Sequence, residues 1–326
     1  VNAMALDECG TIIDPFDGQA DLAGKIIRAV RNAQERFAED GLRMFRACRL
    51  AAQLGFSIED GTANAIRSNL NLTEGLPLER VRRELEEILT SVWPEKGLDA
   101  LVLLGLAGTS CRVKAAGVYT SVDVLPELKH LVDLPQDTEY HRYDVWHHTL
   151  KVVAAVPNDV LIRWAALLHD VGKGLPFLRG IKKNGQPSDY GHERFSAEMA
   201  AGILERLQYP SLFNRRVQWL VSRHMRFVFA SSSSFPALNS WVRREARSGV
   251  FRSTQELVEG FHRLGELGLA DIRGSGKCEA DIGMIPLRET RPMVGLMPTI
   301  PQIDDGHTID PSVSVPMPIA AKFADT

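Results

Sequence analysis

The sequence VLIRWAALLHDVGKG, residues 160–174, determines how the second half of this chain is interpreted. Its opening residues are almost all apolar, which predicts a buried helix, and the glycines that follow the histidine–aspartate pair predict where this helix ends. The pair is His169 and Asp170. Because an unpaired buried carboxylate costs several kcal/mol, Asp170 needs a partner.

Neighbouring helical patterns place further metal-capable side chains on their apolar faces. Each follows apolar residues at spacings of three, four or seven, so each is expected to point inward. These residues are His148, His224 and Asp271, and His192 at the start of another helix is a further candidate. A divalent cation would satisfy the whole set, although each histidine taken alone also fits a satisfied core residue. We expect His148, His169, Asp170 and Asp271 around one ion, with His192 and His224 near a second. Nitrogen and carboxylate ligands do not select one metal among manganese, iron, nickel, zinc and magnesium.

This pattern of H…HD…D with two more histidines resembles the HD phosphohydrolase superfamily. The resemblance implies an all-helical domain, water activated by a divalent metal (Mg²⁺, Mn²⁺ or Ni²⁺) and phosphoester hydrolysis. The implied metal ligands are His148, His169, Asp170, His192, His224 and Asp271, and the implied catalytic residues are Asp170 and Lys173. Lys173 fits either a phosphate contact or a solvated lysine that complements a helix dipole. His147 is expected not to ligate, because it points about 100° away from His148.

The first third of the chain contains the basic stretch ERFAEDGLRMFRACRLAAQLGF, residues 35–56. The pattern predicts one helix over 35–54, with Gly55 as its C-terminal stop. Its arginines recur every third residue, at Arg43, Arg46 and Arg49. An exposed helix face with intrahelical ion pairs would also explain this stripe.

Five motifs occur in order across residues 1–89: VNAMALD, IIDPFDGQADL, KIIRAV, EDGLR and LPLERVRRELEEIL. Together they resemble the class II tRNA nucleotidyltransferase (CCA-adding enzyme) and bacterial poly(A) polymerase family. The resemblance implies that Asp40 and Arg43 act as a protein template for CTP or ATP, and that Arg46 and Arg49 contact the nucleotide and its phosphates. A carboxylate can accept from an exocyclic amino group, and a guanidinium can donate to a ring nitrogen or carbonyl oxygen.

The expected fold is mainly α: a helical neck plus an all-helical HD domain, preceded by a short β-hairpin. The hairpin, in residues 1–14, is interpreted as the remnant of an α/β nucleotidyltransferase head. The expected division is 1–30 for this remnant, 31–125 for the neck and 126–275 for the HD domain. Residues 276–326 are rich in proline and are expected to be a disordered tail. Between residues 108 and 140 we expect a loop, without further strands.

The resemblance also implies a catalytic head that would lie upstream of VNAMAL. The sequence contains no glycine-rich loop followed by a DxD or DxE pair, and Glu279 and Asp281 in the proline-rich tail are interpreted as solvated charges. We therefore expect a truncated chain that does not add CCA by itself.

Composition sets broad limits. The chain has 326 residues, 44% hydrophobic and 24% charged, with a net charge of -3, as in soluble globular proteins. The four cysteines form no CxxC pair, which favours a reducing compartment. No apolar run approaches the ~20 residues that span a bilayer, and no leader pattern opens the chain. A cytoplasmic protein without membrane contact is expected.

The predicted function is tRNA 3′-end processing, with tRNA and CTP or ATP as partners and a metal-dependent HD hydrolase site. One alternative is a free-standing HD phosphohydrolase whose neck is only a scaffold. Another is a non-catalytic tRNA-binding fragment. The arginine stripe favours the first interpretation over a plain hydrolase, and the six-residue ligand set favours either enzyme over the fragment.

Overall fold

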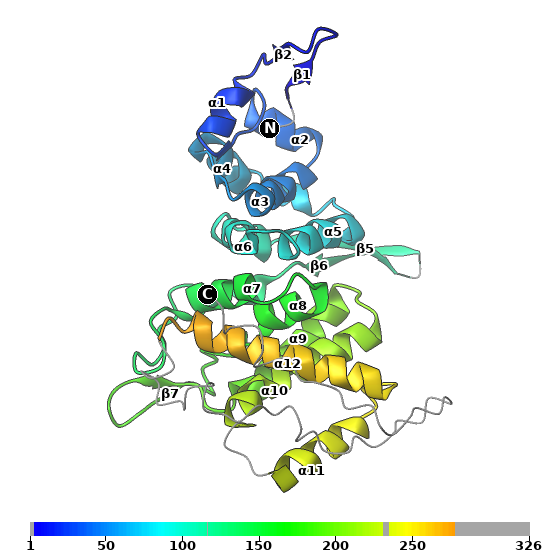
Figure 1. Ribbon diagram of the computed structural model, residues 1–326. Helices are drawn as coiled ribbons and strands as arrows, with labels where there is room; N and C mark the ends of the chain where they lie inside the picture. Colours follow the sequence, from blue (N-terminus) through cyan, green and yellow to red (C-terminus); the bar gives the residue numbers. More distant parts are fainter. Residues whose placement is uncertain (1–2, 116, 231–234, 278–326) are drawn as a thin grey trace. The chain divides into compact units, whose positions relative to one another are not determined.

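The computed structural model describes residues 3–115, 117–230 and 235–277. It is mainly helical, as predicted, and its strands form only two-stranded pairs (Figure 1). The chain divides into two compact units. Unit 1 comprises residues 1–132, 158–163 and 206–208, and unit 2 comprises residues 133–157, 164–205 and 209–326. The predicted domain boundaries stay a prediction.

Unit 1 opens with the predicted hairpin. Strand β1 (Ala5–Leu6) pairs antiparallel with β2 (Ile12–Ile13), and helix α1 (Gly18–Ala23) follows. A short parallel pair that the sequence analysis missed then joins β3 (Ile26–Ile27) to β4 (Ser57–Ile58). The pair ties the start of the helical region to the loop that follows Gly55.

The single helix predicted over 35–54 is wrong, because the chain breaks at Asp40. Helix α2 (Ala33–Glu39) ends there with Asp40 in an extended conformation, and α3 (Leu42–Leu54) starts two residues later. The Asp40 Oδ1 atom accepts a hydrogen bond from the Leu42 amide at 3.1 Å, which holds the turn between the two helices. Gly41 permits the break, since a Cβ there would lie 2.9 Å from the Leu72 carbonyl oxygen.

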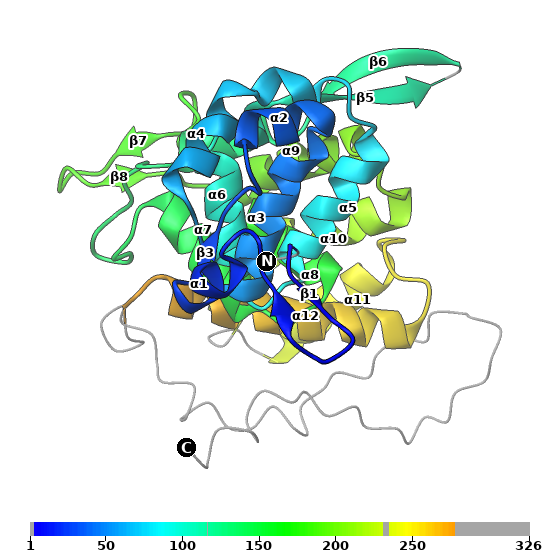
Figure 2. The same ribbon diagram turned by 90° about the horizontal axis from the view of Figure 1, so that it is seen from above.

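Helix α3 forms the centre of the unit 1 core, where it packs on α5 (Leu78–Leu89) and α6 (Pro94–Leu103) (Figure 2). Its inner face buries Met44, Phe45 and Cys48, and α4 (Asp60–Ser68) packs on α2. Gly97 of α6 allows the closest approach, because a Cβ there would lie 2.7 Å from the Cys48 carbonyl oxygen. Because one face of α3 is buried in this core, the arginines of α3 lie outside it.

The loop expected over residues 108–140 contains regular structure. Strand β5 (Ser110–Ala115) pairs antiparallel with β6 (Val118–Asp123), and a 3-10 helix, η3 (Pro126–Leu131), follows. Five of the six β6 residues are exposed. Strand β6 therefore lacks the alternation of apolar and polar residues that reveals a half-buried strand.

Unit 2 contains the predicted second block of helices, apart from the start of α8 (residues 160–163) and the last residue of α9, Arg206, which belong to unit 1. It also contains the small pair of β7 (Gly180–Ile181) and β8 (Pro187–Ser188). Helix α12 packs along both α7 and α10 (Figure 1). The helices are α7 (Val145–Ala155), α8 (Val160–Leu168), α9 (His192–Arg206), α10 (Ser211–Ala230), α11 (Phe235–Ala246) and α12 (Thr254–Gly274).

The predicted disordered tail lies outside the described residues from position 278 onward, together with Glu279 and Asp281. In the described part of the chain, none of the helices combines the length and apolar character needed to cross a membrane.

Candidate functional site

The six predicted metal ligands lie together in unit 2, in two adjoining groups of three. In each group the ligand atoms lie within 4.8 Å of one another. One group contains His148, His169 and Asp271, and the other contains Asp170, His192 and His224. Helices α7, α9, α10 and α12 and the turn after α8 each supply at least one member. The apolar stripes that place these helices in the core also aim their polar members at one another.

Asp170 connects the two groups through its two carboxylate oxygens. Its Oδ2 atom lies 3.2 Å from His169 Nε2 and 3.6 Å from His148 Nε2. Its Oδ1 atom lies 2.9 Å from His192 Nε2. Asp271 Oδ1 approaches His148 Nε2 at 3.0 Å from the far side of the first group. The arrangement thus provides two neighbouring positions for a cation with one carboxylate between them.

Backbone carbonyls fix the orientation of three of the four histidine rings. The Nδ1 atoms lie 2.7 Å from the Ala166 oxygen in His169, 2.9 Å from the Asp189 oxygen in His192 and 2.7 Å from the Val221 oxygen in His224. A carbonyl oxygen can only accept, so each Nδ1 carries the proton and, in the neutral ring, Nε2 presents a lone pair. Such outer contacts are typical of metal-binding histidines.

The facing nitrogens fit a bound cation. His192 Nε2 lies 3.4 Å from His224 Nε2, and His148 Nε2 lies 3.3 Å from His169 Nε2. In the pair of His192 and His224, whose Nδ1 atoms carry the protons, two lone pairs at this separation repel unless a proton or a cation lies between them. Burial, with the charges of neighbouring histidines, lowers the pKa of His224 to about 3, so this ring is neutral at neutral pH and available as a ligand. The donor set and the HD-domain pattern imply a divalent metal ion.

The carboxyl groups of the cluster are held in their charged form. Burial would raise the pKa of Asp170, but the charges of His169, Lys173 and His192 outweigh it and hold this pKa well below its usual value. The pKa of Asp271 is likewise lowered, because His148 outweighs the effect of burial. Both aspartates are therefore available as anionic ligands.

Lys173 is part of this cluster. Its ammonium lies 2.7 Å from Asp170 Oδ2 and donates to Gln136 Oε1 at 2.8 Å, and the residue is only 8% exposed. The interpretation as a solvated surface lysine is therefore wrong, while the phosphate contact stays a prediction. His147, as expected, faces away: its side chain is 57% exposed and contacts Asp144.

His141 is a member of the site that the sequence analysis missed. Its ring packs edge-on against His148, with centroids 5.0 Å apart, and its Nδ1 atom is buried without a hydrogen-bond partner among the described residues. Burial, with the charge of Lys173, lowers the pKa of His141 to about 2. His141 lies in the segment before α7, where no periodicity distinguishes an inward from an outward side chain.

The arginine stripe of α3 borders a separate cavity of about 550 Å³ in unit 1. Arg43 and Arg46 line it together with Arg28, Arg31 and Arg36. Four of these arginines form ion pairs with carboxylates, and Arg31 forms none with the described residues. Because each guanidinium has five N–H donors, donors remain for an anionic ligand such as a nucleotide phosphate.

The other two predicted nucleotide contacts are not among the residues that line this cavity. The Asp40 carboxylate accepts from Arg80 at 3.1 Å. Arg49 Nε lies 3.4 Å from the carboxylate of Glu84, a buried side chain that also lies 3.4 Å from Arg46. Arg46 and Arg49 of the stripe therefore form ion pairs with Glu84 of the neighbouring helix α5. The alternative interpretation, in which the arginines pair with residues of their own helix, does not hold for these two.

Two family models match the chain. The model described as "HD domain" matches residues 138–250, and the model "Probable RNA and SrmB- binding site of polymerase A" matches residues 55–109. The first falls on most of the metal cluster, and the second falls on the helices that follow the arginine stripe.

Curated relatives match over both units. The A-adding tRNA nucleotidyltransferase of Deinococcus radiodurans is 34% identical over 79% of this chain and 60% of its own length. The multifunctional CCA protein of Thioalkalivibrio sulfidiphilus is 35% identical over 65% of this chain and 49% of its own length. The solved structure of the Bacillus stearothermophilus CCA-adding enzyme in complex with CTP was also matched, at 23% sequence identity and a TM-score of 0.48. The match covers 86% of this chain and 53% of the chain in that structure.

The chain spans only part of these relatives, between 49% and 60% of the first two. The multifunctional CCA protein of Pseudomonas fluorescens is matched more fully, at 31% identity over 89% of this chain and 70% of its own length. With that coverage, and with the HD and RNA-binding models in the order that the motifs predict, the chain belongs to the CCA-adding tRNA nucleotidyltransferase family.

Proposed function

We propose that this protein takes part in tRNA 3′-end processing and hydrolyses phosphoesters at the metal cluster of unit 2. The observation that carries the hydrolase part is the convergence of four histidines and two aspartates, with Nε2 atoms facing one another at 3.3 and 3.4 Å. When bound, a divalent ion lowers the pKa of a water molecule and neutralises phosphoryl charge.

The residues of the chain have distinct tasks in this proposal. A divalent ion at the first group would be held by His148, His169 and Asp271, and one at the second group by His192 and His224, with Asp170 beside both groups. Lys173, fixed by Gln136, supplies a positive charge beside Asp170 to attract a phosphoryl group. His141 adds a ring at the edge of the site.

The mixed donor set favours Mn²⁺ or Ni²⁺ over Mg²⁺, because imidazole nitrogens suit Ni²⁺, the two aspartates suit Mn²⁺, and Mg²⁺ prefers a shell of oxygen ligands and water. We expect metal-depleted protein to hydrolyse bis(p-nitrophenyl) phosphate only after a divalent ion is added, with higher rates in Mn²⁺ or Ni²⁺ than in Mg²⁺. Equal hydrolysis by the chelated and the reloaded protein would contradict the proposal.

Nucleotide binding is assigned to the unit 1 cavity. CTP and ATP carry up to four negative charges on their triphosphates, and the five arginines of the cavity offer charge-assisted hydrogen bonds to them. The template role of Asp40 and Arg43 and the nucleotide contacts of Arg46 and Arg49 rest on the motif resemblance. Asp40 would have to release Arg80 to face a base. CCA addition by these 326 residues alone is not part of the proposal.

An Arg43→Ala variant is expected to weaken CTP binding about tenfold, because one charge-assisted hydrogen bond contributes about 1.5–3 kcal/mol. Isothermal titration of the purified chain with CTP measures this. Arg67→Ala, on α4 and outside the cavity, is the matched control and should bind CTP like the unmodified chain. If both variants bind CTP equally well, the cavity is not the nucleotide site.

A further inference from the structure

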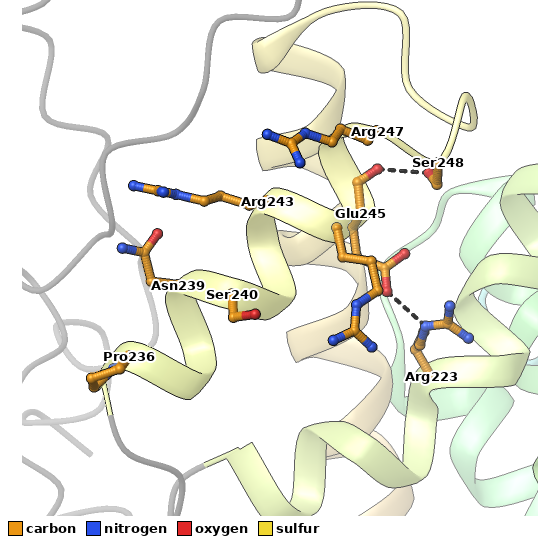
Figure 3. Close-up of a pocket in the computed structure, with 9 residues that line it drawn as sticks. Arg223, Pro236, Asn239, Ser240, Arg243, Glu245, Arg247 and Ser248 are labelled. Carbon is orange, nitrogen blue, oxygen red and sulfur yellow. Dashed lines mark hydrogen bonds and ion pairs between the residues drawn. The ribbon is translucent and has the colours of Figure 1, made fainter.

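A second arginine-rich cavity lies in unit 2, between α11 and the end of α10 (Figure 3). It has a volume of about 750 Å³ and contains none of the six clustered ligands. Four of its nine lining residues are arginines, and one is a carboxylate. They are Arg223, Arg243, Arg244 and Arg247, with Glu245, and the others are Pro236, Asn239, Ser240 and Ser248.

Glu245 pairs with only one of these arginines, Arg223, because its carboxylate is buried and also accepts hydrogen bonds from two tryptophans. It is only 2% exposed and accepts from Trp219 Nε1 at 2.7 Å and from Trp241 Nε1 at 2.9 Å. Arg223 donates to the same carboxylate at 2.9 Å. This buried network joins α10 to α11 and fixes the floor of the cavity.

The remaining three arginines of the cavity have no ion pair with any residue in the part of the chain that the structure describes. Arg243 lies near the end of α11 (Phe235–Ala246), and Arg247 lies in the turn that directly follows this helix. Figure 3 shows both side chains extended to the same side as Asn239. The cavity is thus arranged for an anion.

We infer that this cavity binds phosphates of an RNA backbone. Guanidinium groups match phosphate geometry in paired hydrogen bonds, and the cavity is larger than one phosphate requires. None of the lining residues is aromatic, and Trp241 beneath them is buried and covered by Arg226 at 4.6 Å. The cavity therefore offers no platform on which a base can stack, and contact through the backbone is independent of sequence. The inference rests on the proposed function, in which the substrate is an RNA.

The test compares two double variants of the full chain. Arg243→Ala with Arg247→Ala removes two charges from the cavity. Lys183→Ala with Arg263→Ala removes two charges from elsewhere in unit 2 and serves as the matched control. Affinity for unmodified tRNA is measured by fluorescence anisotropy over a series of salt concentrations. The cavity variant should bind about tenfold more weakly at low salt, and its slope of log Kd against log salt should fall by about two.

Hydrolysis of bis(p-nitrophenyl) phosphate should be unchanged in the cavity variant, which shows that unit 2 is folded and the metal cluster intact. An unchanged salt slope, or an equal fall in the control variant, overturns the inference. Loss of inorganic phosphate binding with tRNA binding unaltered would also overturn it, in favour of a small-anion site. If the unmodified chain hydrolyses the diester but does not bind tRNA, the RNA part of the proposed function fails as well.

Discussion

An Asp170→Ala variant is expected to lose metal-dependent phosphodiester hydrolysis by about a thousandfold or more. Asp170 approaches both groups of ligands, at 3.2 Å on the His169 side and 2.9 Å on the His192 side. A metal ion contributes several kcal/mol of charge stabilisation in the transition state, and about 4 kcal/mol corresponds to a thousandfold in rate. Removal of Asp170 affects both positions at once, and it also leaves Lys173 without its carboxylate partner.

The measurement is the rate of bis(p-nitrophenyl) phosphate hydrolysis at saturating Mn²⁺. Asp170→Asn keeps the side-chain volume and should show the same loss, which separates lost ligation from a folding defect. Glu198→Ala, an exposed carboxylate on α9, is the control and should retain full activity. Hydrolysis by Asp170→Ala at the rate of the unmodified chain would place the active site elsewhere.

Removal of the metal should lower the thermal stability of unit 2. An ion present at about a hundred times its dissociation constant stabilises the folded state by ~2.7 kcal/mol. For a unit of this size that corresponds to a melting temperature about 5–10 °C higher than in chelator. Differential scanning calorimetry with EDTA, and then with added Mn²⁺, measures this difference.

Asp271→Ala tests whether the stabilising ion occupies the cluster. Asp271 Oδ1 lies 3.0 Å from His148 Nε2, and without it the first group keeps only histidines of its own. The metal-dependent rise in melting temperature should therefore shrink in this variant. It should persist in Glu266→Ala, which removes a partly exposed carboxylate from the same helix. An undiminished rise in Asp271→Ala would show that the ion binds outside the cluster.

Much of the metal cluster could be predicted from the sequence, because helical periodicity determines which side chains point inward. His148, His224 and Asp271 follow apolar residues at helical spacing, and the structure places all three in the core of unit 2. The sequence could not predict that one carboxylate oxygen of Asp170 lies beside the first group of ligands and the other oxygen beside the second. This placement depends on the packing of helices that are distant in the sequence, and local spacing does not describe that packing.

The errors have local physical reasons. The break between α2 and α3 lies at Asp40, whose backbone is extended, and the turn there packs closely on the Leu72 carbonyl at Gly41. Helix propensity does not describe such tertiary packing. The β5–β6 hairpin was missed because its second strand is mostly exposed and so lacks an apolar period. Asp40 could be matched to a motif, but its hydrogen bond to Arg80, forty residues later, depends on how α5 packs.

A crystal of this chain soaked in Mn²⁺, with anomalous differences recorded, tests the central claim most directly. The account predicts anomalous peaks inside the cluster, one among His148, His169 and Asp271 and one among Asp170, His192 and His224. Mn²⁺ peaks that lie only at other sites of the chain, with this cluster free of anomalous density, would contradict it.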